Sequence, residues 1–485
     1  MRPFTLTAGL ASLGLLLLCA PLVGCGAPAS STGGGQGGDG GAGGGAGGST
    51  AQSGPTFHKD IEPILQRSCQ SCHSPGSIAP FSVVTYEDAK LVSVLMKEQT
   101  ASRKMPPWGA FETSECTPKH GFRDDLRLTQ AEIDLFAAWS DNGAPEGDPA
   151  DAPPPIDFKG ADLPGMDMEI QPVTPYVSSG DKDQFRCFVM DPGFDQDVFL
   201  NGWHFIAGNP EVVHHALLFV DPNAEGDALA DADGGYDCFG GSGVNGSLIA
   251  AWAPGGVPFE LPANIGTRLP KGSRLVMQIH YHPVGVTADP DSTRIQMRFT
   301  QSPEYEMAVA LIGNMNKQSA NGDGLQPGPS DAGKVEFRIP AEASNHTETM
   351  LFTLPDTING GPMPDLYVYG SATHMHYVGR DMKIEVEHKS PKSSETGTEC
   401  LLQTPDWDFS WQRTYVYDTE IQALPRFLPG DVLRMRCTYD NTLANPYVQR
   451  ALKDQGLQSP VDVYLGEETL DEMCLSALSL IYKVK

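Results

Sequence analysis

The sequence predicts a multidomain chain in which a small all-α domain precedes a longer all-β part built of sandwiches. Residues 55–148 carry apolar positions at helical spacing and helix-capping patterns, whereas the later residues form short β-type runs punctuated by Gly, Pro, Asn and Asp. A proline-rich break at residues 152–155 separates the two compositions. With 485 residues, the chain has room for two to four domains.

The chain begins with a pattern typical of an export signal. Arg2 precedes an apolar run that is too short to cross a bilayer, so residues 1–24 are expected to be a signal peptide. The run ends in Leu-Val-Gly-Cys25, which resembles the lipobox of bacterial lipoproteins and implies lipid attachment at Cys25. Residues 25–54 are mostly Gly, Ala and Ser, which indicates a flexible tether. We therefore expect an exported protein, anchored to a bacterial membrane on its periplasmic or cell-surface side.

The composition is acidic, with 61 Asp and Glu against 33 Lys and Arg and a net charge of −28. This charge argues against nucleic acid as a partner, and its simplest role is solubility. Export to an oxidising compartment predicts that cysteines form disulfides or covalent attachments.

The expected helices of the small domain follow from apolar spacing and capping residues. An apolar stripe from Phe57 to Leu65 indicates the first helix. Thr85-x-x-Asp88 caps a helical run from Tyr86 to Gln99. The capping box Thr129-x-x-Glu132 opens a last helix that ends at Asn142-Gly143.

Directly after the first stripe stands Cys69-x-x-Cys72-His73, the pattern of covalent haem attachment. Two thiols one helical turn apart can add to the two vinyl groups of a haem, and the next residue offers an imidazole to the iron. A redox dithiol and half of a zinc site are the competing interpretations. The adjacent histidine, and a sequence without a second C-x-x-C, argue against both.

A sixth iron ligand is expected at Met105, in a loop stiffened by Pro106 and Pro107. Met96 is the comparison, and its place within a helical run favours a core role. Helix, haem motif, methionine loop and closing helix together resemble a class I cytochrome c over residues 55–148, which implies a carrier of single electrons. Residues 149–166 are then a proline-rich linker.

Six of the 12 histidines fall in three tight clusters within the β-type part: His214-His215, His280-x-His282 and His374-x-His376. Residues i and i+2 of a strand share a face, so His374 and His376 can reach one ion. Adjacent His214 and His215 need a twist or a bulge to converge. Such clusters suit zinc, copper, iron or nickel, and a thioether ligand shifts the preference to copper. Met473 is a candidate, although a methionine in isolation is more often a core residue.

The order of these motifs, with Arg436-Cys437 and Glu472-Met473-Cys474 after them, resembles the copper type II, ascorbate-dependent monooxygenases over residues 165–485. The resemblance implies two β-sandwich, jelly-roll-like domains at 167–302 and 303–485, each holding one copper. It implies one copper on His214, His215 and His280, and a second on His374, His376 and Met473, with His282 in a supporting role. It also implies the disulfides Cys437–Cys474 and Cys187–Cys238, and leaves open whether Cys116 and Cys400 pair.

The same resemblance implies that O2 is activated at the copper of His374, His376 and Met473, and that one oxygen atom enters an sp3 C–H bond of an organic substrate. A one-electron donor is required, either an ascorbate-like reductant or a redox protein. The fused haem domain is the expected donor, with the copper of His214, His215 and His280 as its acceptor. Peptide-hydroxylating members clamp a carboxylate with Arg, Asn and Tyr where this chain has Ala372, Leu475 and Ala477, which suggests a less charged or bulkier substrate.

Two rival functions remain at the level of sequence. One is an exported haem and copper protein that binds metal or transfers electrons without oxygenase activity. The other is a histidine-rich zinc or iron hydrolase on a β-sandwich, which would need neither Met473 nor the haem.

Overall fold

The structure is a computed structural model that describes residues 54–75, 79–156, 162–179, 184–238, 241–252, 256–281, 287–358, 360–409, 411–466 and 470–484. The expected signal peptide, Cys25, most of the tether and His282 lie outside these ranges.

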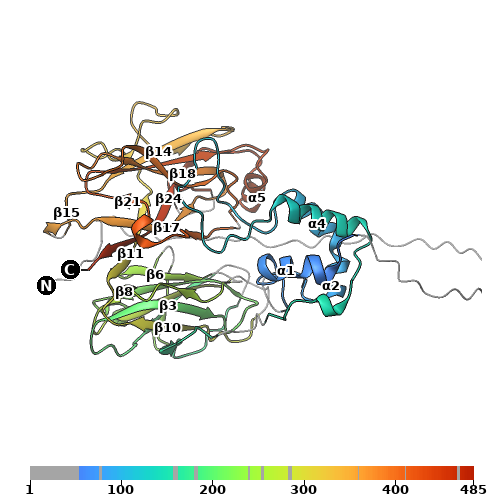
Figure 1. The fold of residues 1–485 in the computed structure, drawn as a ribbon. Coiled ribbons are helices and arrows are strands. Elements are labelled where there is room, and N and C mark those ends of the chain that lie inside the picture. The colour runs from blue at the N-terminus through green and yellow to red at the C-terminus, as the bar shows by residue number, and fades with distance from the viewer. Residues whose placement is uncertain are drawn as a thin grey trace, which may run out of the picture.

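The helices gather near the N-terminal end of the described chain, and Figure 1 shows them beside the strands. They are the helical turn η1 (Phe57–Ile61), α1 (Glu62–Ser68), α2 (Tyr86–Leu91), α3 (Ser93–Ala101) and α4 (Gln130–Asp141). Shorter pieces lie further on: η2 (Pro149–Asp151), η3 (Glu225–Ala228), η4 (Ile421–Ala423) and α5 (Pro446–Asp454). Phe57, Ile61, Leu65, Phe136 and Trp139 form a small core between η1, α1 and α4.

Capping side chains stand where two of these helices begin, and at the start of α2 the Thr85 side chain accepts from the Asp88 backbone N–H. The Thr129 side chain accepts from the Glu132 backbone N–H while the Glu132 carboxylate accepts from Thr129, so the predicted capping box is confirmed. The predicted single helix from Tyr86 to Gln99 is wrong, because the chain breaks at Val92 (φ −107°, ψ 12°) into α2 and α3. A β-branched residue loses side-chain freedom in a helix, and Val92 packs against the small core instead.

The first half of the β part contains two sheets. One sheet has the order β5-β2-β9-β4-β6, with β2 (Gln184–Met190), β4 (Val213–Asp221), β5 (Gly235–Asp237), β6 (Ser247–Trp252) and β9 (Arg274–Tyr281). The other contains β1 (Met168–Ile170), β10 (Arg294–Thr300), β3 (Val198–Ile206) and β8 (Ile265–Leu269), with β7 (Phe259–Glu260) beside β3. Apolar side chains of both sheets share one core, as in a sandwich.

The second half repeats this plan. One sheet has the order β11-β24-β17-β20, with β11 (Tyr305–Gly313), β24 (Leu475–Lys483), β17 (Leu366–His374), β20 (Thr414–Val416) and the short β21 (Arg426–Phe427). The other is β12 (Gly324–Leu325), β14 (His346–Thr353), β22 (Val432–Tyr439), β18 (Gly379–His388) and β19 (Gly397–Thr404). Two ribbons are added, β13 (Arg338–Ile339) with β23 (Val463–Tyr464) and β15 (Thr357–Ile358) with β16 (Gly361–Pro362).

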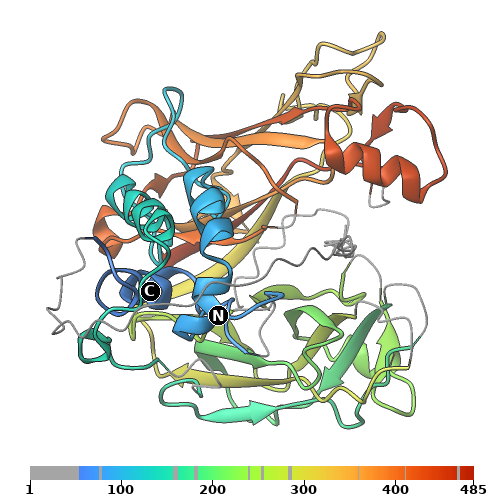
Figure 2. The ribbon, with the colours of Figure 1, turned by 90° about the vertical axis from the view of Figure 1, so that its right-hand side faces the viewer.

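A parallel contact between β8 and β11 joins the two halves into one continuous ten-stranded sheet, with Tyr305 opposite Ile265 and Glu306 opposite Gly266. Figure 2 shows the helices in front of both halves, with the second half above the first. The described chain is therefore mostly β-sheet arranged as sandwiches, with a few helices at one end. Within its described part, no helix is both long and apolar enough to cross a membrane.

Candidate metal centres

Three histidines of the first sandwich converge through their Nδ1 atoms. His215 on β4 lies opposite His280 on β9, and the pairing shifts register between Val213 and His215. This irregularity is the bulge that two adjacent histidines need in order to face one centre. The Nδ1 atom of His215 lies 3.1 Å from Nδ1 of His214 and 3.2 Å from Nδ1 of His280.

These separations fit a bound cation. Nitrogens held at about 2.0–2.1 Å from one metal ion lie roughly 3–3.4 Å apart when the angle between them is near tetrahedral. His215 is buried, and this burial is the main reason why the pKa of its imidazole lies well below the usual range. The neighbouring His280 and His214 lower the pKa further. Phe185 stacks on the His280 ring with centroids 4.3 Å apart and nearly parallel planes. A buried, neutral imidazole such as that of His215 is a ready metal ligand.

The second pair, His374 and His376, presents the other ring nitrogen. His374 is the last residue of β17 and donates from Nδ1 to Gln412 Oε1 at 2.7 Å. His376 follows in the loop and donates from Nδ1 to the carbonyl of Asp471 at 3.0 Å. Because both acceptors can only accept, each Nδ1 carries the proton and each Nε2 keeps its lone pair. Both Nε2 atoms are buried and have no hydrogen-bond partner among the described residues.

Glu472 joins this pair to Met473. One oxygen of its buried carboxylate accepts from the backbone N–H groups of His376 and of Met473, the latter at 2.7 Å, and the other accepts from Val378 at 3.2 Å. Burial raises the pKa of Glu472 to about 8, against the lowering effect of these N–H groups. Met473 is fully buried, and its neighbour Cys474 is bonded to Cys437. The carboxylate therefore fixes the backbone on both sides of the candidate site.

The His374 and His376 pKa values give a testable pH dependence. Burial lowers them to about 3 and about 4, whereas in the unfolded chain they are near 6.5. Between these values the unfolded chain binds protons that the folded chain does not, so unfolding becomes easier as pH falls below 6.5. The metal-free protein should lose about 2 kcal/mol per imidazole between pH 7 and pH 5. Thermal unfolding checks this, and a His374→Gln, His376→Gln variant should show a clearly smaller pH slope; an equal slope would contradict the assignment.

The expected haem segment also has a defined geometry. Cys69 and Cys72 are the free cysteines of the described chain, whereas the other six described cysteines are in disulfides. His73 donates from Nδ1 to the Phe81 carbonyl at 3.1 Å, which leaves the Nε2 lone pair available to a metal. Met105 is half-buried in the loop between α3 and α4. Burial raises the pKa of the Cys69 thiol to about 12 and also lowers the pKa of His73.

The cysteine pairs Cys187–Cys238 and Cys437–Cys474 are those that the resemblance implies, and Cys116 pairs with Cys400. Sequence reasoning missed Gln412, Asp471 and Glu472, which hold the second histidine pair. Of these three residues, only Glu472 could have been suspected from the sequence, because it directly precedes the candidate ligand Met473. Gln412 lies 38 residues from its histidine, and no pattern in the chain points to it.

No protein-family model matches the chain. It is 24% identical to human DBH-like monooxygenase protein 1 over 287 residues, which are 56% of this chain and 39% of that protein. It is 24% identical to mouse DBH-like monooxygenase protein 2 over 278 residues, 55% of this chain and 38% of that protein. It is also 24% identical to a human DBH-like monooxygenase protein 2 over 277 residues, which are 55% of this chain and 46% of that protein. The matched part spans less than half of each relative.

Two solved structures align over most of their own length. They are PNGase F, a glycosylasparaginase from Flavobacterium meningosepticum, at 9% identity over 65% of this chain and 95% of its own, and the major capsid protein P2 of bacteriophage PM2, at 8% over 66% and 98%. Both have a TM-score of 0.25, which is too low to indicate a shared fold.

Proposed function

We propose that this chain is a copper-dependent monooxygenase that hydroxylates an sp3 C–H bond of an organic substrate with O2. The proposal depends on the buried Nε2 atoms of His374 and His376, which have no hydrogen-bond partner in the described part of the chain and are held next to Met473 by Glu472. The distant similarity to DBH-like monooxygenase proteins supports the same conclusion.

Two ligand sets follow. His214, His215 and His280 would hold one copper through Nδ1, and His374, His376 and Met473 would hold the other. The bound copper ions would supply the two electrons of a monooxygenation and the reactivity toward O2. The thioether at the second set favours the reduced, softer state of the metal.

The chain's own residues prepare these sets in three ways. Burial keeps His215, His374 and His376 neutral at physiological pH, so that no proton competes for the ligand atoms. Gln412 and the Asp471 carbonyl select the tautomer that leaves Nε2 available. The same burial excludes water from the ligand atoms, since His374 and His376 are only 5% and 4% exposed.

The electron donor in this proposal is a haem c bound to Cys69 and Cys72, with His73 and Met105 as iron ligands. It is supported by the two free thiols and by the Nδ1 bond of His73 to a carbonyl. Three disulfides are typical of an extracellular or periplasmic protein. Lipid anchoring through Cys25 belongs to the same proposal.

The strands beside His374 favour an uncharged substrate. Leu475 lies opposite His374 in the pairing of β17 with β24, and Ala372 lies opposite Ala477 two residues away. Leu311 of β11 lies on the other side of Ala477. These small and apolar positions offer no cation for a substrate carboxylate, so we propose an apolar or bulky substrate.

Metal analysis and O2 uptake test this function. The purified mature protein should contain about two coppers and one iron per chain, because two histidine sets and one haem motif are present. With ascorbate as reductant, uncharged organic substrates should stimulate O2 uptake more than peptides with a free carboxylate do. Zinc in place of copper would contradict the proposal. Bound copper and haem without substrate-dependent O2 uptake would favour an electron-transfer or metal-binding protein.

A further inference from the structure

The segment between α3 and α4, residues 105–127, leaves the helical part and lies along the second sandwich. We call it the docking segment. Its backbone bonds to strands of that sandwich: Phe111 N–H donates to the Gln403 carbonyl at 3.3 Å, and Arg123 N–H donates to the Val416 carbonyl at 2.8 Å. Phe122 and Tyr417 form an isolated antiparallel bridge. The segment that carries Met105 is therefore attached to the edge of β19 and β20.

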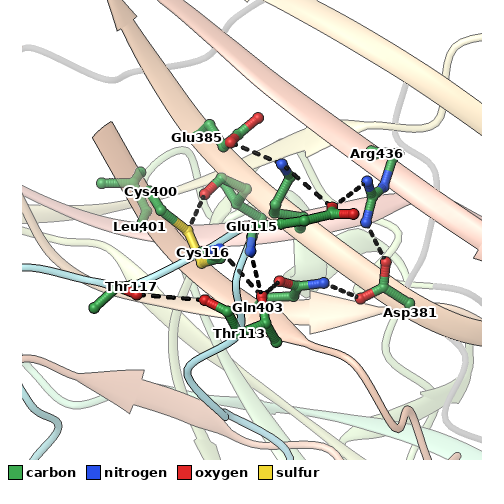
Figure 3. The surroundings of a disulfide bond; sticks show 12 residues. Thr113, Glu115, Cys116, Thr117, Asp381, Glu385, Cys400, Leu401, Gln403 and Arg436 are labelled. Atoms are coloured by element: carbon green, nitrogen blue, oxygen red, sulfur yellow. Dashed lines mark hydrogen bonds and ion pairs between the residues drawn. A yellow bond between two sulfur atoms is a disulfide. The ribbon is translucent and has the colours of Figure 1, made fainter. Parts of the chain in front are cut away.

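A disulfide fixes this attachment covalently. Cys116 of the docking segment is bonded to Cys400 of β19, and Figure 3 shows the polar contacts around the bond. Glu115 pairs with Arg436 at 2.6 Å, and Thr113 Oγ1 donates to Gln403 Oε1 at 2.7 Å. A covalent bond between two segments 284 residues apart in sequence restricts how far they can separate.

The contacts are one-sided. Every hydrogen bond, ion pair and disulfide recorded between the docking segment and the described sandwich residues goes to the second sandwich. Among the residues that the structure describes, its one ring contact with the first sandwich is that of the Arg123 guanidinium, which lies 5.8 Å from the centroid of the Phe259 ring. The helical part is thus fastened to the half of the molecule that contains His374.

A short chain of contacts leads from the docking segment to His374. Trp108, three residues after Met105, lies edge-on to Tyr415, and the Arg413 guanidinium lies 4.6 Å from the Trp108 ring centroid. The Tyr415 hydroxyl accepts from Gly109 N–H at 2.9 Å. Arg413 follows Gln412, the residue whose side-chain oxygen accepts from His374 Nδ1.

The Arg413 charge also acts on the C-x-x-C-H motif. Burial raises the pKa of the Cys72 thiol, whereas the hydrogen bond from Ser71 and, after it, the Arg413 charge lower this pKa. Arg413 thus contacts Trp108 and acts electrostatically on Cys72, while the preceding residue, Gln412, accepts a hydrogen bond from a candidate copper ligand.

We propose that the docking segment and Arg413 position the haem for electron transfer to the His374, His376 and Met473 site. This inference rests on the proposed function, and it replaces the first sandwich as the point where electrons enter. In each transfer a ferrous haem becomes ferric and one Cu(II) at the site becomes Cu(I). No bond to carbon forms or breaks in this step.

Anaerobic pulse reduction of the full-length, copper-loaded protein tests the route. The haem is reduced rapidly, its reoxidation is followed in the visible spectrum, and freeze-quench electron paramagnetic resonance identifies the Cu(II) signal that disappears. We expect a fast reoxidation phase that survives His280→Ala and is lost in His374→Ala. The inference would be overturned if the fast phase were lost in His280→Ala and kept in His374→Ala. It would also be overturned if, in the wild-type protein, the Cu(II) signal that disappears were that of the His214, His215 and His280 site.

Arg413→Met tests the positioning role without touching a ligand. It should lose the fast phase while the haem spectrum and the copper content stay unchanged, and Arg413→Lys should restore part of the rate. The matched control is Arg434→Met, because Arg434 is an exposed arginine of the second sandwich, on β22, that lies outside the docking segment; this variant should keep the fast phase. An Arg413→Met protein as fast as the unchanged one would refute the positioning role. Copper and iron without any fast phase contradict this inference alone, whereas a protein without copper contradicts the proposed function as well.

Discussion

Replacing Met473 with Leu should reduce substrate-dependent O2 uptake by about 100-fold or more, because even changes to groups that only support a metal ligand cost 10- to 100-fold. The substitution removes the thioether but keeps the volume, so the buried site should lose less than about 1.5 kcal/mol of stability. The haem spectrum should be unchanged, since the C-x-x-C-H motif belongs to the helical part. O2 uptake and the visible spectrum are measured on the same sample.

Met435→Leu is the control for this experiment. Met435 is also buried in the second sandwich, on β22, and packs in the core without a proposed ligand role. It should retain turnover. Turnover in Met473→Leu equal to that in Met435→Leu would show that the thioether is not a ligand that matters, and the assignment of Met473 would have to be given up.

Replacing Glu472 with Leu should destabilise the protein by about 3 kcal/mol or more, because each buried N–H group left without an acceptor costs about 1–3 kcal/mol. The backbone N–H groups of His376, Met473 and Val378 would lose their acceptor together. The second copper should be lost while the first is retained, since the carboxylate fixes the backbone of only one ligand set. Thermal unfolding and copper analysis measure the two effects separately.

Glu348→Leu separates stability from metal binding. Glu348 is also buried in the second sandwich, and its carboxylate pairs with His346 at 2.6 Å rather than with the backbone of a candidate ligand. It should lower the unfolding temperature and leave the copper content intact. If both variants lost copper alike, Glu472 would act only through general stability.

The stability and copper content of Glu472→Gln should lie between those of Glu472→Leu and those of the wild-type protein. The reason is that the amide oxygen of the glutamine can still accept the hydrogen bonds from the backbone N–H groups of His376 and Met473.

Local chemistry made part of the fold predictable. The Thr129-Glu132 capping box and the apolar stripe from Phe57 to Leu65 involve residues within a few positions of one another, and the structure contains both as expected. The break at Val92 was not predictable in this way, because it depends on packing against the small core rather than on spacing. The same holds for the edge contact between β8 and β11.

The candidate sites divide along the same line. The histidine clusters are visible in sequence, and the need for a bulge at His214-His215 followed from the alternation of side chains along a strand. The argument that His374 and His376 share a strand face was incomplete, because β17 ends at His374 and the Glu472 carboxylate positions His376. Gln412, and the pairing of Cys116 with Cys400, connect residues far apart in the chain, so only the folded molecule reveals them.

The pairing of Tyr305 with Ile265, where β11 meets β8, affects how the protein can be divided for study. A fragment that stops near residue 302 would expose part of β8 as a free strand edge, and a fragment that starts there would expose β11. Free edges of this kind template association with other chains. Fragments cut at this junction should therefore self-associate unless the missing edge is supplied, and the full chain is the better material for spectroscopy and crystallisation.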